Sequence, residues 1–482
     1  MKDIYRDWME FCEYAPEEMD KEYPRLREAF KRLTLEEADI QRGKERAVKY
    51  FQCNLRGMRM ILGCLVRTCV DMILSKDEGK LKFFFEMPMG MIGPVLGAAS
   101  LVRDDIVVAC PGMYHELLMG NFFDKYDFLI QFAEERQLPQ GVSHCGCNQA
   151  KYALKGMGIV PVADLNVSTG NYCDEAPKAD EGVAREFGER QIYMYRPQDE
   201  YLYEPPGQGE HLEYFAGSID LVRQELADVV GAEITDDMVK KNLYPYLLMA
   251  AELKKLEEIR AHCDPQVLRS AVHDFVWASY TFSPGLQGHE RRMEALRVLI
   301  EELNGMVARG EGVVEKGAPR VMYGPLNSFV TPGIGHTLEE AGINLCCFEA
   351  YGNPNVSPEE MALMIDNTPA SVIIAMMWLC YPMIFLNCRI ASMKAGIDKA
   401  GNMDGILMLA HHACRIFGSD MLMMKKALKE DMKVDIPIVI VEYDIYDPKY
   451  YNAEQIGNRL ESFAEVVKVY KASKALYSSQ KH

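Results

Sequence analysis

Three cysteines stand where a thiolate can act as a metal ligand. Cys145 opens a predicted helix in SHCGCNQAKYALKG, where exposed N–H groups and the helix dipole stabilise a thiolate and an anionic cluster. Cys173 and Cys414 each follow a short apolar run, VADLNVST and GILMLA, of the kind that forms a buried parallel strand. Ligands of an open parallel sheet collect beyond the carboxyl ends of its strands. We therefore expect these two side chains to project into such a crevice.

The spacing of these three cysteines matches no familiar local metal-binding motif. They lie 28 and 241 residues apart, which fits neither a zinc ribbon nor a ferredoxin run, so only the fold can bring them together. In the Cys-Gly-Cys doublet, Cys147 is a rival to Cys145 as the ligand. Most other cysteines are expected to be small buried hydrophobic residues. These include Cys64, Cys69, Cys380 and Cys388.

Histidines next to two of these cysteines are candidate proton donors. His411 and His412 lie just before Cys414, and His144 precedes Cys145. A histidine exchanges a proton near neutral pH, so we predict His411 and His412 as the catalytic acids. The alternative is that each histidine only supports the neighbouring cysteine or lies in a plain loop.

Other charged and polar residues near the third cysteine have more ordinary explanations. Glu442 and Asp444 end the strand IPIVIVEYD, where a satisfied strand-end carboxylate is the simpler interpretation. Arg459 lies at helical spacing in EQIGNRLESF and is expected to anchor that helix by ion pairing. Ser419 and Asp420 are expected to cap a helix that begins at MLMMKK.

Two stretches of strand–helix alternation are expected to position these residues. Short apolar runs alternate with amphipathic stretches over residues 81–205 and again over 317–482. This pattern predicts an α/β protein with two Rossmann-like domains built on parallel sheets. Helical spacing predicts an N-terminal helical extension over 1–80 and a helical connecting region over 206–316. The first α/β domain would hold the first two cysteines of the trio, and the second domain would hold the third.

Composition and charge exclude several classes of protein. With 53 basic and 71 acidic residues the formal charge is −18, which argues against nucleic-acid binding because phosphate neutralisation needs a basic surface. The apolar run over 371–388 contains Pro382 and is bounded by the polar Asn387 and Arg389, so we expect a buried helix pair rather than a membrane span. No complete dinucleotide fingerprint or Walker loop occurs, so this chain is expected to bind no nucleotide.

The beginning of the chain and the cysteine pattern predict a cytoplasmic location. Residues 1–30 are charged and helix-like, without the basic start and apolar core of a signal peptide. The 14 cysteines have no regular spacing, which is typical of thiols in a reduced compartment rather than of a disulfide framework.

The segments around the three cysteines resemble one enzyme superfamily. HHACRIFGSDMLMMKKALKE, followed by IPIVIVEYDIYDPKYYNAEQIGNRLESFAE, is similar to the C-terminal signature of the 2-hydroxyacyl-CoA dehydratases and ATP-dependent (class I) benzoyl-CoA reductases. SHCGCNQAKYALKG and NYCDEAPKADEGVAREFGERQIYMYRP resemble the two earlier cysteine segments of these iron–sulfur catalytic subunits, in the same order. The resemblance, which includes the 2-hydroxyglutaryl-CoA dehydratase D-component, covers most of residues 81–480 and is strongest in the last eighty.

This resemblance implies a cofactor, partners and a substrate class. Cys145, Cys173 and Cys414 stand at the positions that hold one [4Fe-4S] cluster per chain in the family, with one iron lacking a cysteine ligand. It further implies a heterodimer with a homologous smaller cluster-binding subunit. A separate iron–sulfur activator would supply low-potential electrons by ATP hydrolysis, and the substrate would be an acyl- or aryl-CoA thioester. Such an enzyme belongs to anaerobic metabolism, and air is expected to inactivate it.

Details near the C-terminus favour one branch of the superfamily. VEYDIYDPKYY, NRLES and LMMKK resemble the larger catalytic subunit of benzoyl-CoA-type reductases more than a dehydratase subunit. The resemblance thus implies an oxidoreductase that delivers electrons to an aryl-CoA through a radical intermediate. The alternatives are a subunit of an (R)-2-hydroxyacyl-CoA dehydratase, which eliminates water through a ketyl radical, and a double-cubane-type redox protein without a CoA substrate. A further alternative is a cluster-free α/β binding protein whose cysteines are merely buried.

Overall fold

The computed structural model describes most of the chain. The described residues are 3–86, 90–138, 144–170, 175–195, 210–283, 285–324, 332–352, 358–379, 386–447, 449 and 452–479. Of the residues singled out above, Cys173, Cys380 and Pro382 lie outside these ranges.

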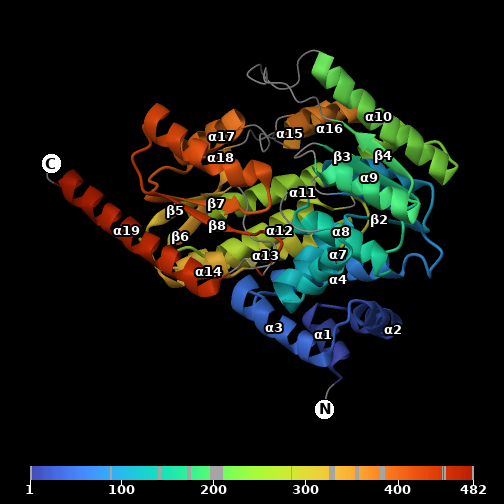
Figure 1. Ribbon diagram of the computed structural model, residues 1–482, viewed down its shortest axis with the longest axis horizontal. Helices are drawn as coiled ribbons and strands as arrows, with labels where there is room; N and C mark the ends of the chain where they lie inside the picture. The colour runs from blue at the N-terminus through green and yellow to red at the C-terminus, as the bar shows by residue number, and fades with distance from the viewer. Residues whose placement is uncertain are drawn as a thin grey trace.

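Four helices form the N-terminal region, and Figure 1 shows the first three of them at one end of the molecule. They are α1 (Ile4–Phe11), α2 (Pro16–Arg32), α3 (Glu37–Phe51) and α4 (Arg56–Leu74). Trp8 of α1 and Phe30 of α2 pack on Phe123, which lies beyond the first strands, with ring centroids 5.2 and 5.6 Å from that of Phe123. The N-terminal helices therefore share a hydrophobic core with the first α/β domain.

The first sheet has four parallel strands, β1 (Leu81–Phe85), β2 (Ile106–Ala109), β3 (Leu165–Thr169) and β4 (Gln191–Met194). Their order is β2-β1-β3-β4, and Phe84 pairs with Ala109 on one side and Asn166 on the other. The order in which strands are added to the sheet therefore reverses between β1 and β3. Open α/β sheets bind ligands at such a switch point. The intervening elements are η1 (Gly90–Ile92), α5 (Gly93–Gly97), η2 (Ala98–Leu101), α6 (Pro111–His115), η3 (Glu116–Phe123), α7 (Asp127–Glu135), α8 (Gly146–Gly156) and α9 (Glu175–Phe187).

A group of helices connects the two sheets. It comprises α10 (Glu210–Val230), α11 (Asp236–His262), α12 (Ser270–Thr281) and α13 (His289–Arg309). Figure 1 shows α11 and α12 between the sheets, and both ends of this region are anchored by side chains. Asn242 of α11 donates to the Pro94 carbonyl at 2.5 Å in the first domain. The fully buried Arg260 of α11 donates to the Leu345 carbonyl at 2.8 Å in the second.

The second sheet repeats the strand order of the first. Its parallel strands β5 (Arg320–Gly324), β6 (Asn344–Phe348), β7 (Gly405–His411) and β8 (Ile438–Tyr443) run in the order β6-β5-β7-β8. Two parallel sheets with helices around them confirm the predicted α/β class with two Rossmann-like domains. The remaining elements are α14 (Gly333–Glu340), η4 (Glu349–Gly352), α15 (Pro358–Asn367), α16 (Ala370–Leu379), α17 (Leu386–Ala400), α18 (Arg415–Lys426), η5 (Ala427–Asp431) and α19 (Ala453–Ser479).

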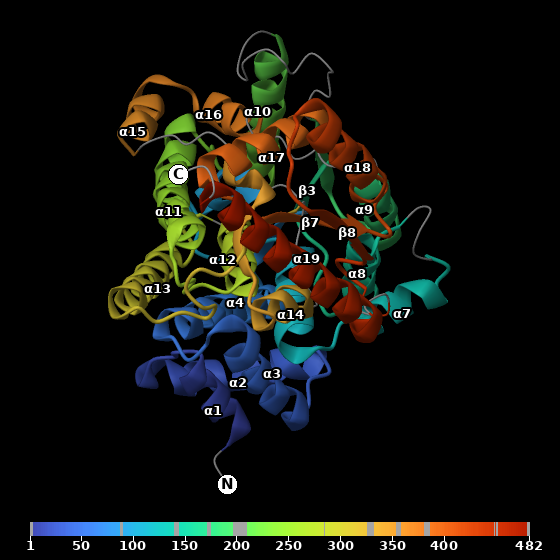
Figure 2. The ribbon, with the colours of Figure 1, turned by 90° about the vertical axis from the view of Figure 1, so that its left-hand side faces the viewer.

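The last helix, α19, lies across the second sheet (Figure 2). It can approach closely because β7 begins with Gly405: a Cβ atom there would lie 2.8 Å from Val467 Cγ2 and 3.1 Å from Phe463 Cζ. Arg459 of α19 donates to the Ile440 carbonyl of edge strand β8 at 2.7 Å. Arg459 thus anchors the helix as expected, but it bonds a backbone carbonyl rather than a carboxylate.

Two sequence expectations concern helix boundaries. The apolar run forms two helices, α16 and α17, on either side of residues 380–385. Among the described residues, none of the helices is both long and apolar enough to cross a bilayer. The expectation that Ser419 and Asp420 cap a helix was wrong, because α18 begins at Arg415 with Cys414 as its N-cap. Serine and aspartate are preferred N-caps, so the sequence pattern did not indicate the sulfur N-cap, which lies five residues before Ser419.

Candidate functional site

Cys414 stands at the carboxyl end of β7, on the first turn of α18. Its Sγ accepts a hydrogen bond from the Phe417 N–H at 3.4 Å, and the Gly418 N–H donates to its carbonyl at 2.7 Å. A Cβ atom on Gly418 would lie 3.0 Å from the His411 carbonyl oxygen, so the turn from strand to helix is tight. The side chain is half-buried. This geometry places a sulfur at the amino end of a helix, where N–H groups stabilise a thiolate.

Cys145 occupies the equivalent place on α8. It is the N-cap residue, with extended backbone angles (φ −88°, ψ 166°), and the Gln149 N–H donates to its carbonyl at 3.1 Å. Its side chain is also half-buried. His144, just before it, is half-buried, and burial lowers the pKa of its imidazole. Like Cys414, Cys145 therefore presents a sulfur at a helix amino end.

Tyr446, in the segment that follows β8, joins the two cysteine environments. A Cβ atom on Gly146 would lie only 2.7 Å from Tyr446 Cβ, so the start of α8 packs directly on this segment. The Tyr446 ring lies 5.5 Å from the His411 ring at the end of β7. Burial raises the pKa of the Tyr446 hydroxyl, and the nearby Glu116 carboxyl and the thiols of Cys147, Cys145 and Cys414 raise it further. The fold thus brings the start of α8, next to Cys145, and the end of β7, which precedes Cys414, to one buried phenol.

The second thiol of the Cys-Gly-Cys doublet has a different environment. Cys147 is buried with 3% of its surface exposed. Burial raises the pKa of this thiol well above its usual value, and the neighbouring Glu116 carboxyl raises it further. Glu116 is itself buried, accepts from the Tyr126 hydroxyl at 3.3 Å, and has its pKa raised by burial to about 8. Cys147 is therefore enclosed among buried groups, unlike the half-buried Cys145 at the helix amino end.

The two predicted proton donors also differ from one another. His411 is buried, and burial lowers the pKa of its imidazole to about 3. Its Nδ1 lies 3.3 Å from Asp444 Oδ2 and accepts from the Ile445 N–H at 3.4 Å. His412 is 45% exposed, with its Nδ1 3.7 Å from Glu442 Oε1. The carboxylates at the end of β8 are thus the partners of the two histidines, one buried and one at the surface.

A pocket of 810 Å³ lies beside the third cysteine. It is lined from four elements, β7, α18, β8 and α19, and its polar lining includes His412, Cys414, Glu442 and Arg459. The pocket is large enough for a drug-sized ligand. The pocket gives a ligand access to both Cys414 and the exposed His412 imidazole.

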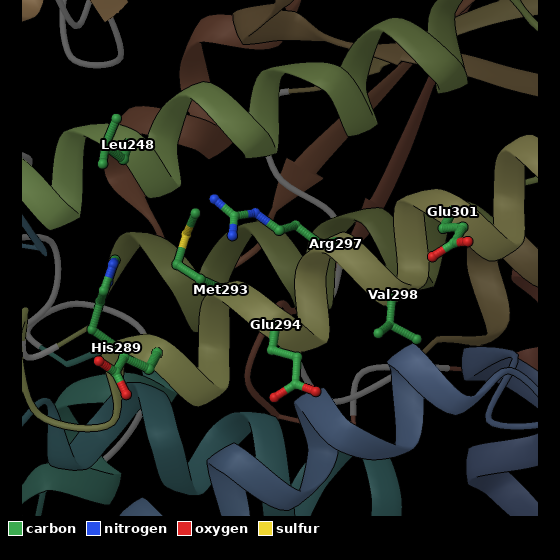
Figure 3. A pocket seen from close by; sticks show the side chains of 8 residues that line it. Leu248, His289, Met293, Glu294, Arg297, Val298 and Glu301 are labelled. Atoms are coloured by element: carbon green, nitrogen blue, oxygen red, sulfur yellow. The ribbon is translucent and has the colours of Figure 1, made fainter.

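A second, smaller hollow lies between α11 and α13. Its volume is 330 Å³, and Figure 3 shows Met293 and Arg297 reaching from α13 toward Leu248 of α11. The residues predicted from the sequence as ligands or proton donors do not line it. We assign the hollow no part in the site.

Sequence reasoning missed a buried ion pair in the first domain. Lys151 of α8 has its Nζ 2.9 Å from Asp180 Oδ1 of α9 and 3.8 Å from Glu86 Oε2, just after β1. All three side chains are 2% exposed. The Ser168 hydroxyl of β3 donates to the other oxygen of Asp180. Burial raises the pKa of Glu86 to about 7.

A similar cluster was missed in the second domain. The fully buried Arg389 of α17 has its Nε 3.2 Å from Glu349 Oε1 and its Nη1 3.2 Å from Asp420 Oδ2 of α18. Its guanidinium also lies 4.7 Å from the centre of the Phe417 ring. The sequence contained one signal for each cluster: a lysine within a buried helix and an arginine ending an apolar run.

Two of the three predicted ligands have donor chemistry that suits an anionic iron–sulfur cluster. Among the described residues, no group of three or more histidine, cysteine or acidic side chains is arranged to hold a metal ion. Cys145 and Cys414 supply two sulfurs at helix amino ends, which suit thiolate ligation. Cys173, the third predicted ligand, lies outside the described residues.

Comparison with known proteins identifies the family of the chain. The family model for "2-hydroxyglutaryl-CoA dehydratase, D-component" matches residues 105–467. This range covers three strands of the first sheet, the helical connection and the whole second sheet. A search of curated proteins finds no match. The family match confirms the resemblance read from the cysteine segments.

Proposed function

Because this chain belongs to the 2-hydroxyglutaryl-CoA dehydratase D-component family, we propose that it is the catalytic subunit of an iron–sulfur enzyme. We further propose that its partners are a homologous smaller subunit and an ATP-hydrolysing activator. The family implies an enzyme that acts on CoA thioesters by radical chemistry. The observation that supports the proposal is the packing against Tyr446 of Gly146, next to Cys145, and of His411, three residues before Cys414.

In this proposal, Cys145, Cys173 and Cys414 hold one [4Fe-4S] cluster and leave one iron without a cysteine ligand. A cluster of this kind supplies a low-potential electron to the substrate when it is bound. The choice of Cys145 over Cys147 rests on burial: Cys145 is half-buried at a helix amino end, whereas Cys147 is enclosed beside Glu116.

The chain's own side chains bind the substrate and handle protons. In the 810 Å³ pocket, His412 is exposed close to Cys414, and we assign it the delivery of a proton to the substrate. His411 uses its Nδ1 to accept from the Ile445 N–H, so it orients the end of β8. Arg459 lines the same pocket and adds a positive charge that suits an anionic part of a CoA thioester.

For the reaction itself, we propose reduction of an aryl-CoA of the benzoyl-CoA type. The residues that favour it are those of the strand end and turn, VEYDIYDPKYY, and the helix segment NRLES. The second candidate is dehydration of an (R)-2-hydroxyacyl-CoA, which the description of the matching family favours. The two differ in electron count, because reduction of the ring consumes electrons, whereas elimination of water returns them.

Metal analysis tests the cofactor part of the proposal. On anaerobically purified protein we expect about four irons and about four acid-labile sulfides per chain, with a paramagnetic signal after reduction. Protein without iron, even after reconstitution, would refute the proposal. An assay with the activator and ATP then separates the two reactions: an aryl-CoA yields a reduced ring with stoichiometric electron consumption, and a 2-hydroxyacyl-CoA yields an enoyl-CoA with catalytic amounts of reductant.

A further inference from the structure

Both described cysteines of the site begin a helix that carries a charged residue six positions further on. Cys145 is followed by Lys151 on α8, and Cys414 by Asp420 on α18. Each of these charges faces inward and pairs with a neighbouring helix. The two domains therefore share one arrangement: the charged residue on the helix of the cysteine is a cation in the first domain and an anion in the second.

In the first domain the pair joins several elements near the carboxyl ends of the strands. Asp180 on α9 accepts from Lys151 with one carboxylate oxygen and from the Ser168 hydroxyl of β3 with the other. Glu86, directly after β1, has its Oε2 3.8 Å from the Lys151 ammonium. The position of α8, and with it Cys145, is thereby tied to β1, β3 and α9.

In the second domain the cation is on the adjacent helix. Arg389 of α17 holds Asp420 of α18 with one arm of its guanidinium and Glu349, directly after β6, with another. Arg389 has none of its side chain exposed, and Asp420 has 18%. The position of α18, and with it Cys414, is tied to α17 and to the end of β6.

Such pairs are better suited to fixing a geometry than to adding stability. Removing charges from water costs nearly as much as their attraction returns, but an unpaired buried charge is strongly unfavourable, so only one arrangement of the partners is tolerated. A site that binds a metal needs its ligands held to within about 0.5 Å by supporting contacts. Each pair includes a residue of a helix whose N-cap is a cysteine of the site.

We propose that the Lys151–Asp180 and Arg389–Asp420 pairs are positioning residues that set how Cys145 and Cys414 present their sulfurs to the iron–sulfur cluster. The inference rests on the proposed function and adds to it the residues that act through the ligands rather than as ligands.

The chain offers a matched control on the same helix. Lys155, one turn beyond Lys151 on α8, has its Nζ 2.5 Å from Glu189 Oε2, and these side chains are 2% and 0% exposed. Glu189 lies just before β4 and also accepts from the Ala163 N–H at 2.9 Å. This second pair is as buried as the first but lies at the amino ends of the strands, at the other end of α8 from Cys145.

The experiment compares Asp180→Asn and Asp420→Asn with Glu189→Gln in the full-length protein. Thermal unfolding of the metal-free proteins measures the structural cost of each change. Iron release to a chelator and the paramagnetic spectrum of the reduced protein then report the ligand geometry. We expect the affinity for iron to fall roughly 10- to 100-fold in the first two variants, as for other residues that support metal ligands, so iron release should be faster and the g values altered. In Glu189→Gln, release and spectrum should stay as in the unmodified protein despite a comparable loss of stability.

The outcomes separate this inference from the proposed function. If the unmodified protein holds no iron after reconstitution, the proposed function fails, and this inference fails with it. If the unmodified protein holds iron and all three variants keep its release rate and spectrum, only the inference is overturned. It is also overturned if Glu189→Gln loses iron as fast as Asp180→Asn, because the effect then follows stability alone.

Discussion

The packing of Gly146 on Tyr446 makes Gly146→Ala a direct probe of the contact between the domains. The new Cβ would lie 2.7 Å from Tyr446 Cβ and 3.4 Å from Ile130 Cδ1. Carbon atoms pack at about 3.5–4.0 Å, so the α8 amino end and the Tyr446 segment must move about 1 Å apart. The Tyr446 atom concerned is next to the backbone, so rotation of the side chain cannot remove the clash.

The expected cost follows from this displacement. Overpacking of a well-filled core costs about 1–3 kcal/mol, and Gly146 is the first residue of α8, where alanine's helix propensity adds little in return. We expect Gly146→Ala to lower the free energy of unfolding of the metal-free protein by about 1–3 kcal/mol. A shift of about 1 Å also exceeds the tolerance of about 0.5 Å for metal ligands, so iron content should fall as well.

Urea unfolding followed by circular dichroism measures the stability change, and iron per chain measures the second effect. Gly182→Ala is the matched control, because Gly182 lies within α9 and a Cβ there meets nothing within 4 Å. That change should be neutral or stabilise by about 0.4–1 kcal/mol. If Gly146→Ala unfolds at the same urea concentration as the unmodified protein and keeps its iron, the close packing of the two domains at this point is wrong.

Three further predictions follow from the site. Burial raises the pKa of Glu116 to about 8 from its ordinary value of 4.5, so its contribution to the stability of the metal-free protein is full below pH 4.5 and is lost as pH rises to 8. This loss is a dependence of the free energy of unfolding on pH, with a slope of up to about 1.4 kcal/mol per pH unit. Glu116→Gln should remove this dependence, as measured by urea unfolding at pH 5 and pH 8, and an unchanged pH dependence would count against a buried acid at Glu116. Cys145→Ala should abolish iron binding while Cys147→Ala keeps it, and the reverse result by metal analysis would exchange their roles. Arg459→Ala removes the hydrogen bond to the Ile440 carbonyl and should cost about 0.5–1.5 kcal/mol in thermal unfolding; no change would show that α19 is held by its apolar face alone.

The sequence was sufficient for the fold because its signals are local. Apolar runs such as GILMLA and IPIVIVEYD form β7 and β8, and their placement before Cys414 and Asp444 followed from the alternation of strands and helices. The start of α18 was missed because Cys414, a sulfur residue, caps it, whereas Ser419 and Asp420 look like ordinary caps.

The supporting charges could not be found in this way because their partners are distant in sequence. Lys151 pairs with a carboxylate 29 residues away, and Arg389 with one 31 residues away. Neither distance corresponds to a helical or strand period, so no local pattern connects the partners. Arg389 was read as the polar end of an apolar run, although its guanidinium is fully buried. Burial of a charge is a property of the tertiary structure and has to be observed there.

The meeting of Cys145 and Cys414 at Tyr446 has a consequence for biosynthesis. These cysteines are 269 residues apart, and Tyr446 comes 32 residues after the second. A ribosome must therefore complete almost the entire chain before both sulfurs and the tyrosine can come together. Domains that emerge early generally fold first, so the contact of Gly146 with Tyr446 can form only after the second domain has emerged. In the proposed function, loading of a cluster held by both Cys145 and Cys414 would then be a late step, because Cys414 is absent until most of the chain has been made.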